Sequence, residues 1–110
     1  MTTITGSLTY GYCDDAGTVH ADFEMRVPTL SDLEAAIEQA PPNASPARLS
    51  RYVWARTVIR LGTLPAEAIT PELLGGLPYT EYSVLEAAEK ALLGKLVPAS
   101  AGSATSGSSK

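Results

Sequence analysis

Residues 3–27 read TITGSLTYGYCDDAGTVHADFEMRV, and apolar or small side chains take every second position in both halves of this segment. Such an alternation is typical of strands that bury one face and expose the other. Residues 14–17 (DDAG) separate the two halves and are of turn-forming types. We therefore expect a β-hairpin over residues 3–27, closed by a four-residue loop.

The length of this loop predicts which residues face each other across the hairpin. With residues 14–17 as the loop, the facing pairs are Tyr12–Val19, Tyr10–Ala21, Leu8–Phe23, Gly6–Met25 and Ile4–Val27. All apolar side chains then share one face, while Cys13 and His20 lie on the opposite, solvated face. A hairpin is only marginally stable by itself, so its apolar face must pack against the rest of the chain.

Capping residues and proline or glycine breaks divide the rest of the chain into four expected helices. These helices cover about residues 30–40, 46–61, 71–74 and 79–93. Because the strands precede the helices, the order predicts an α+β fold, with an N-terminal β-hairpin packed on a small bundle of three to four helices. We expect one domain over residues 1–97, followed by a disordered Ser/Gly/Ala-rich tail over residues 98–110.

The first two helices have recognisable starts. The first can begin at Thr29, with Asp32 in its first turn, or at Ser31, which has capping-box spacing to Glu34. Its packing side is expected to carry Leu30, Leu33 and Ile37. Ser45 and Pro46 begin the second helix, which is apolar around much of its circumference. A helix of that kind is central to a domain or waits for a partner.

Length and charge exclude several classes of protein. The chain has 110 residues and a net charge of −4, so it lacks the basic surface that nucleic-acid binding requires. Its longest apolar runs are too short to span a membrane, and residues 1–5 lack the features of a signal peptide. A single cysteine cannot form an internal disulfide, so we expect a reducing, cytoplasmic setting. From the charge and the short apolar runs we expect neither a nucleic-acid nor a membrane partner.

Residues that carry catalytic or metal chemistry are sparse. Cys13 and His20 are too few for a zinc site, and a nucleophilic Cys13 would need a base and an orienting group, for which the single histidine has no evident partner. Gly75 and Gly76 follow a helix rather than the strand that precedes a phosphate-binding loop. The residues Asp14 and Asp15 are expected to form the turn, and the arginines Arg48, Arg51, Arg56 and Arg60 to pair with acids of the last helix. We expect no enzyme, cofactor or metal.

Apolar side chains, in contrast, exceed what two helices of so small a domain can bury. This surplus predicts a groove or helix face that binds an apolar partner segment. The sequence does not separate core from interface among the candidates. They are Trp54, Val58, Leu61, Tyr82, Leu85, Leu92 and Leu96.

Three short motifs follow in an informative order: RVPTLSDL at residues 26–33, IRLGTLP at residues 59–65, and the pair Glu81-Tyr82 at the start of the last helix. In their order and spacing, over roughly residues 3–96, the chain resembles the phage tail assembly chaperones of Mu-like and related long-tailed phages or prophages. The proline-rich break at residues 41–45 and the tail beyond Pro98 depart from that family's pattern.

The resemblance implies a non-enzymatic protein that acts in the host cytoplasm and is absent from the mature virion. It implies binding to the tape measure protein, which is kept soluble while the tail tube assembles. A longer, frameshifted form would also bind the tail tube protein. The alternatives are a small structural tail or baseplate subunit retained in the virion, and a small regulatory or toxin–antitoxin-type interaction module. An enzyme would need a cofactor or partner chain to supply catalytic groups.

Overall fold

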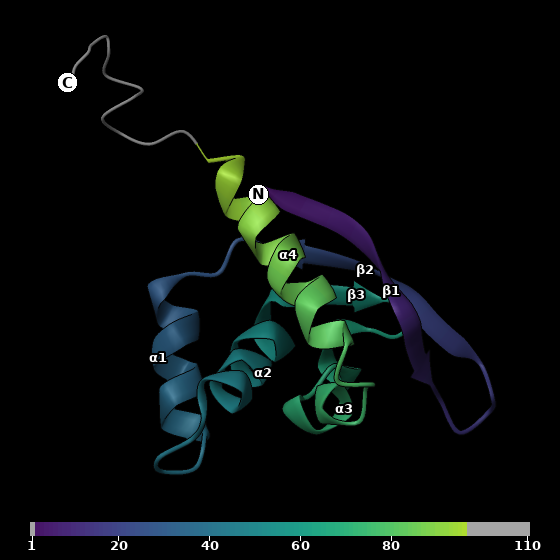
Figure 1. The fold of residues 1–110 in the computed structure, drawn as a ribbon, viewed down its shortest axis with the longest axis horizontal. Coiled ribbons are helices and arrows are strands. Elements are labelled where there is room, and N and C mark those ends of the chain that lie inside the picture. Colours follow the sequence, from purple (N-terminus) through teal and green to yellow (C-terminus); the bar gives the residue numbers. More distant parts are fainter. Residues whose placement is uncertain (1, 97–110) are drawn as a thin grey trace, which may run out of the picture.

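The computed structural model describes residues 2–96, in which a three-stranded antiparallel sheet packs against helices (Figure 1). The strands, in the order β1-β2-β3, are β1 (Thr3–Cys13), β2 (Val19–Arg26) and β3 (Val58–Leu61). The α-helices are α1 (Leu30–Gln39), α2 (Pro46–Thr57), α3 (Pro71–Gly75) and α4 (Glu81–Gly94), and a 3-10 turn, η1, spans Ala66–Ala68. The predicted α+β class is confirmed. The tail predicted at residues 98–110 lies outside the described residues.

The third strand is a correction to the predicted helix over residues 46–61, since α2 ends at Thr57. Val58 and Ile59 are β-branched and favour the extended conformation. β3 pairs with the edge of β2, with Leu61 opposite Phe23. The predicted helix was apolar around much of its circumference because its apolar residues belong partly to α2 and partly to β3.

The hairpin exists, but four of the five predicted facing pairs are wrong, and the fifth, Tyr10–Ala21, falls in an irregular part of the ladder. Gly6 lies opposite Phe23 and Tyr12 opposite His20, so that residues 8–11 of β1 bulge out against Ala21 alone. The loop holds five residues instead of four, since the Asp14 N–H donates to the Thr18 carbonyl over 2.9 Å. The Asp14 carboxylate fixes this loop by accepting the backbone N–H groups of Ala16 and Thr18.

His20 is buried on the face of β2 opposite Phe23 and Met25, between the Asp14 loop and Thr63. It was predicted on the solvated face, but its side chain is only 3% exposed. Tyr12 stacks on the imidazole with ring centroids 6.4 Å apart. Cys13 is exposed, as expected.

The helix starts follow their capping residues. Thr29, not Ser31, caps α1, and Thr29 and Asp32 form a reciprocal capping box. Ser45 caps α2 and Thr70 caps α3, each by accepting a backbone N–H three residues later. α4 begins at Glu81, two residues after its predicted start at Tyr79.

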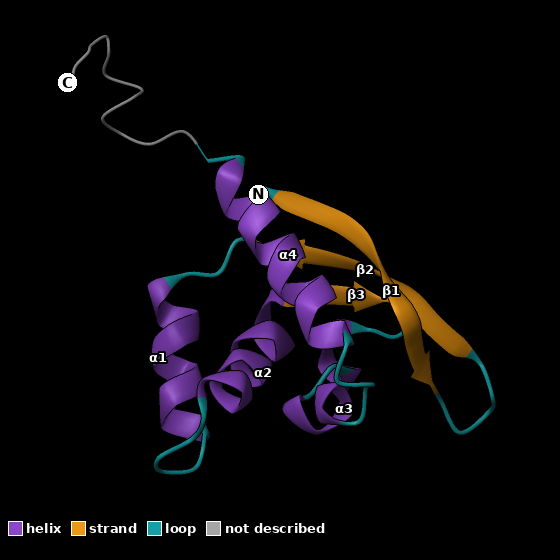
Figure 2. Ribbon diagram, viewed as in Figure 1, coloured by secondary structure: helices purple, strands orange, loops and turns teal. Residues whose placement is uncertain are grey.

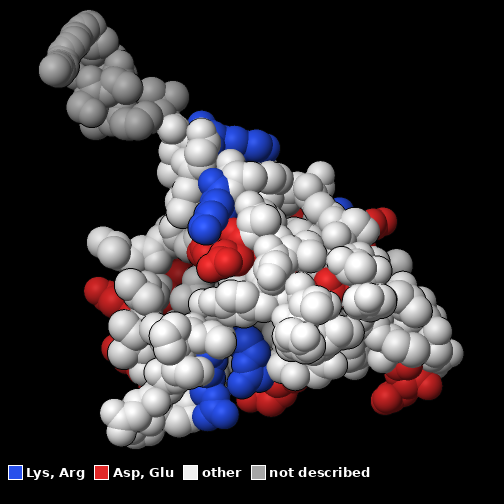
Figure 3. All heavy atoms as spheres, viewed as in Figure 1, with Lys and Arg blue, Asp and Glu red and all other residues white. Residues whose placement is uncertain are grey.

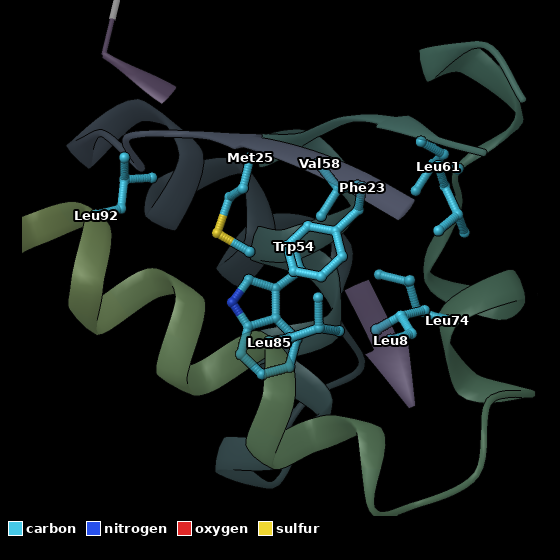
Figure 4. Close-up of a cluster of buried hydrophobic side chains, with 10 residues drawn as sticks. Leu8, Phe23, Met25, Trp54, Val58, Leu61, Leu74, Leu85 and Leu92 are labelled. Carbon is cyan, nitrogen blue, oxygen red and sulfur yellow. The ribbon is translucent and has the colours of Figure 1, made fainter. Parts of the chain in front are cut away.

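The core lies between α4, α2 and one face of the sheet, which Figure 2 shows with helices and strands in separate colours. In Figure 4 the Trp54 indole lies among Phe23 and Met25 of β2 and Leu85 of α4. Tyr82 meets the indole edge-on, with ring centroids 5.1 Å apart. Burying one such large apolar side chain contributes about 1.5–3 kcal/mol, so this cluster is the main stabilising feature.

Candidate partner-binding surface

The structure places five of the seven predicted partner-binding residues in the core. These buried residues are Trp54, Val58, Leu61, Leu85 and Leu92. Tyr82 is half-buried at the start of α4, and Leu96 is exposed just beyond its end. The two lie about 20 Å apart along the helix axis, because each helical residue adds about 1.5 Å. They do not form one continuous patch.

A different apolar surface lies on α1, and we call it the α1 stripe: Leu30, Leu33 and Ile37. These side chains are 79%, 41% and 57% exposed. They were predicted to form the packing side of the helix, and this prediction is wrong. Their spacing of three and four residues places them on one helix face, which is the spacing of core residues as well. The sequence therefore identifies the stripe but not the side on which it faces solvent.

Asp32 explains why α1 packs with its apolar stripe outward. Its carboxylate accepts two N–H bonds from Arg26, at 2.7 and 2.8 Å, and one from Arg56 at 3.0 Å. These charged hydrogen bonds, from Arg26 above all, hold the pKa of the buried Asp32 carboxyl far below its usual range, against the opposing effect of burial. α1 is thus fixed to β2 and α2 by a polar cluster, and Ala36 is its one buried apolar residue.

The α1 stripe continues into a groove of about 530 Å³ between α1 and α2, which we call the α1–α2 groove. Leu30 and Leu33 line one wall and Leu49 and Val53 the other. Its further lining residues are Pro28, Thr29, Pro46, Ser50, Trp54 and Glu89. A groove with apolar walls and few polar groups suits an apolar side-chain row from another molecule.

Glu89 of α4 is the acidic residue in this groove. Burial raises the pKa of Glu89, and the negative charge of Glu86 adds to the rise. The Trp54 indole nitrogen lies close enough to offset part of it, although no hydrogen bond joins the two. The indole N–H therefore has no acceptor among the described residues, and Glu89 is easier to protonate than an exposed carboxyl.

A second groove, the α2–α4 groove, has a volume of about 650 Å³. Arg48 and Arg51 of α2 line it, opposite Tyr79 and Tyr82. Leu74 and Gly75 of α3 also contribute, as do Ser45, Ala47, Trp54, Leu77, Pro78, Thr80, Glu81, Ser83 and Leu85. Its lining combines two arginines with aromatic and aliphatic side chains, whereas no arginine or lysine lines the α1–α2 groove.

The arginines do not pair with α4 as the sequence suggested. Arg56 binds Asp32, and Arg60 lies 4.0 Å from Glu24 of β2. Arg51 donates to the Pro71 carbonyl over 3.0 Å. Within residues 2–96 none of these arginines has a salt bridge to α4.

His20, which was considered as a metal ligand, has both ring nitrogens in contact with other residues. Its Nε2 lies 2.8 Å from the Asp14 carboxylate, and its Nδ1 accepts the Thr63 N–H over 3.2 Å. Both ring nitrogens are therefore engaged in holding the loop and the end of β3. In the described part of the chain, no group of three or more His, Cys, Asp or Glu side chains is placed to hold a metal ion.

Comparison with known proteins gives no relative: no family model, curated protein or solved structure matches this chain. Among residues 2–96, no helix has the length and apolar character needed to cross a bilayer. The function must therefore be argued from the exposed surface. The sequence does carry a signal for that surface, the apolar spacing of Leu30, Leu33 and Ile37, but the prediction assigned these residues to the packing side of the helix.

Proposed function

We propose that this protein is a phage tail assembly chaperone that binds the tape measure protein and keeps it soluble during tail tube assembly. The observation that carries the proposal is the α1 stripe beside the α1–α2 groove. An amphipathic helix docks by laying an apolar row against such a surface. The tape measure protein of the family that this sequence resembles is a long, largely helical chain.

The size of the surface suits repeated, weak binding. α1 has ten residues and is therefore about 15 Å long, so one copy covers two to three turns of a partner helix. Many copies along one long partner multiply a modest affinity per site. The net charge of −4 then keeps a coated partner in solution.

This role belongs to the host cytoplasm during assembly and leaves the protein absent from the finished virion. A longer, frameshifted form would also bring the tail tube protein to the complex. The competing role is a small tail or baseplate subunit that stays in the virion. The two roles differ in whether the chain is found in purified particles.

The test is co-expression with the long helical protein encoded just downstream, followed by affinity pull-down and size-exclusion chromatography. The wild-type chain should make the partner soluble and elute with it in several copies. The double variant Leu30→Ser/Ile37→Ser should lose this co-elution, because it removes two exposed apolar contacts without touching the core. The matched control is Tyr10→Ser/Val19→Ser, which removes two well-exposed apolar side chains from the hairpin and should bind as the wild type does.

Two results would overturn the proposal. If the chain is a stoichiometric component of purified particles, it is a structural subunit. If the α1 double variant and the hairpin control bind the partner equally well, the α1 stripe is not the binding surface.

A further inference from the structure

The two arginines of the α2–α4 groove differ from the other three in this protein. Arg26 and Arg56 bind the Asp32 carboxylate, and Arg60 lies 4.0 Å from Glu24. Arg48 and Arg51 have no carboxylate within 4.0 Å among residues 2–96. Both line the same groove, so two uncompensated guanidinium groups face one recess.

Arg51 is held in a fixed position. Its Nη1 donates to the Pro71 carbonyl over 3.0 Å. The guanidinium lies directly against the backbone of Gly75, where a Cβ would overlap Nη1. Gly75, which has no positive φ, therefore leaves room for the guanidinium, and a side chain there would displace it. A guanidinium has five N–H donors, so most of them remain for a ligand, and its orientation costs no further ordering.

The rest of the groove adds to its positive potential. It is lined by the first turns of α2 and α4, whose N-terminal ends carry partial positive charge. The Glu81 carboxylate is the acidic group in the lining, but it is buried and accepts the N–H groups of Thr9, Tyr10 and Gly11 over 2.7–2.9 Å. Figure 3 shows basic side chains gathered over α2 with acidic side chains beside them, and the exposed Glu72 lies in the first turn of the neighbouring α3.

Aromatic side chains form the opposite wall. Tyr79 is 90% exposed, and the half-buried Tyr82 packs on Trp54 below it. Tyrosines beside arginines are the residue types that dominate binding energy at protein interfaces. A volume of about 650 Å³ is that of a pocket for a ligand of a few residues.

We propose that the α2–α4 groove binds an acidic peptide segment of a partner protein. Carboxylate side chains of the segment bind Arg48 and Arg51, and a neighbouring apolar or aromatic side chain packs on Tyr79 and Tyr82. Arg51 supplies a two-pronged hydrogen-bonding surface that carboxylates match. The site includes no residue of the α1 stripe, so it can be tested independently of the proposed tape measure binding.

The direct test uses three synthetic hexapeptides on the full-length protein: Glu-Glu-Tyr-Leu-Glu-Glu, the same peptide with Gln for Glu, and the same with Lys for Glu. Trp54 is the only tryptophan and lines the groove, so a change in its fluorescence reports binding; because Trp54 also lines the α1–α2 groove, the variants below are needed to assign the change. The acidic peptide should bind about tenfold more tightly than the Gln peptide. This advantage should shrink as salt is raised from 20 to 300 mM, because the contact is charged.

The variants assign the effect to the groove. Arg48→Gln and Arg51→Gln should each remove most of the preference for the acidic peptide, and Gly75→Ala should do the same by displacing the Arg51 guanidinium. Arg60→Gln is the matched control, since this exposed arginine lies outside the groove and should leave the preference unchanged. Thermal unfolding of every variant separates loss of binding from loss of fold. Should Gly75→Ala unfold, the two arginine variants still decide the matter.

Three outcomes would overturn the proposal. The Gln peptide could bind as tightly as the acidic one, or Arg60→Gln could weaken binding as much as Arg51→Gln does. Micromolar sodium sulfate could also displace the peptide fully where sodium chloride of the same ionic strength does not. That result would make the groove a site for small anions. Loss of the preference in the groove variants alone would establish it.

Discussion

At the residue scale, Asp32 shows how one carboxylate sets the position of a helix. It caps α1 through Thr29 and joins α1 to β2 and α2 through Arg26 and Arg56. A buried carboxylate is stable only when such partners replace its water. The same arrangement frees the other side of α1 from a packing role, so the apolar α1 stripe faces solvent.

Asp32→Asn should therefore lower the free energy of unfolding by about 3 kcal/mol, because it leaves two guanidinium groups without their carboxylate. Urea denaturation followed by circular dichroism measures the change. Asp15→Asn, at an exposed turn position, is the control and should alter stability by less than about 0.5 kcal/mol. A similar stability for both variants would show that the polar cluster does not hold α1.

Glu81 has a comparable role at the start of α4. Burial raises the pKa of its carboxyl, but the N–H groups of Gly11, Tyr10 and Thr9 outweigh burial and leave the pKa below its usual value. Glu81→Gln should cost about 1–3 kcal/mol, since one acceptor oxygen becomes an amide that faces N–H donors. Glu72→Gln is a matched control because Glu72 is also acidic, in the first turn of α3, and exposed. Equal unfolding midpoints for the two variants would contradict this role.

At the element scale, the bulge in β1 depends on Gly11. Its φ of +79° is unfavourable for other residues, and a Cβ there would lie 2.8 Å from the His20 carbonyl oxygen. Gly11→Ala should destabilise the fold by about 2–3 kcal/mol through strain and overlap together. Gly17→Ala has a similar φ of +86° with no atom within 4 Å, so it should cost only about 1 kcal/mol. Thermal unfolding of the two variants separates the steric contribution, and equal costs would refute it.

The elements themselves were largely readable from the sequence. The hairpin, the caps at Thr29, Ser45 and Thr70, and the α+β class follow from local patterns. β3 was missed because residues 58–61 fit a helical as well as an extended pattern, and only pairing with β2, more than thirty residues earlier, decides between them. The hairpin register was missed for the same reason: the bulge is held by Glu81, about seventy residues away.

The candidate surfaces were less predictable than the fold. Apolar spacing marked Leu30, Leu33 and Ile37 as a helix face, but helical periodicity is the same for a face that meets the core and one that meets solvent. The distinction came from Asp32, whose side chain turns the opposite face of α1 inward. Likewise, Arg56 pairs with Asp32, and Arg51 has no carboxylate nearby in the described part of the chain; both depend on tertiary contacts that no local pattern encodes.

At the scale of the whole molecule, acid should unfold this protein through its buried carboxylates. Asp32 and Glu81 have pKa values below their ordinary 3.8 and 4.5, so below about pH 4.5 the unfolded chain binds more protons than the folded one. Their contribution is complete above that pH and is lost as the pH falls towards the folded pKa values. Glu89, whose pKa is raised, opposes the trend weakly.

The urea midpoint should therefore fall steadily between pH 5 and pH 3, measured at constant ionic strength. Asp32→Asn, although less stable at pH 7, should show a shallower fall because it lacks one of the carboxyl groups whose pKa the fold lowers, which also include Asp14 and Glu81. A midpoint that stays constant over this range, or a variant as pH-sensitive as the wild type, would contradict this account.

The contact between Glu81 and β1 can form only after most of the chain has been synthesised. The carboxylate follows the amides that it binds by 70, 71 and 72 residues. At about 5–20 residues per second, translation delivers it roughly 4–14 s after those amides have been made. During that interval the N–H groups of residues 9–11 lack the carboxylate that accepts them in the folded protein. The irregular part of the first strand is therefore completed among the last, when the final helix leaves the ribosome.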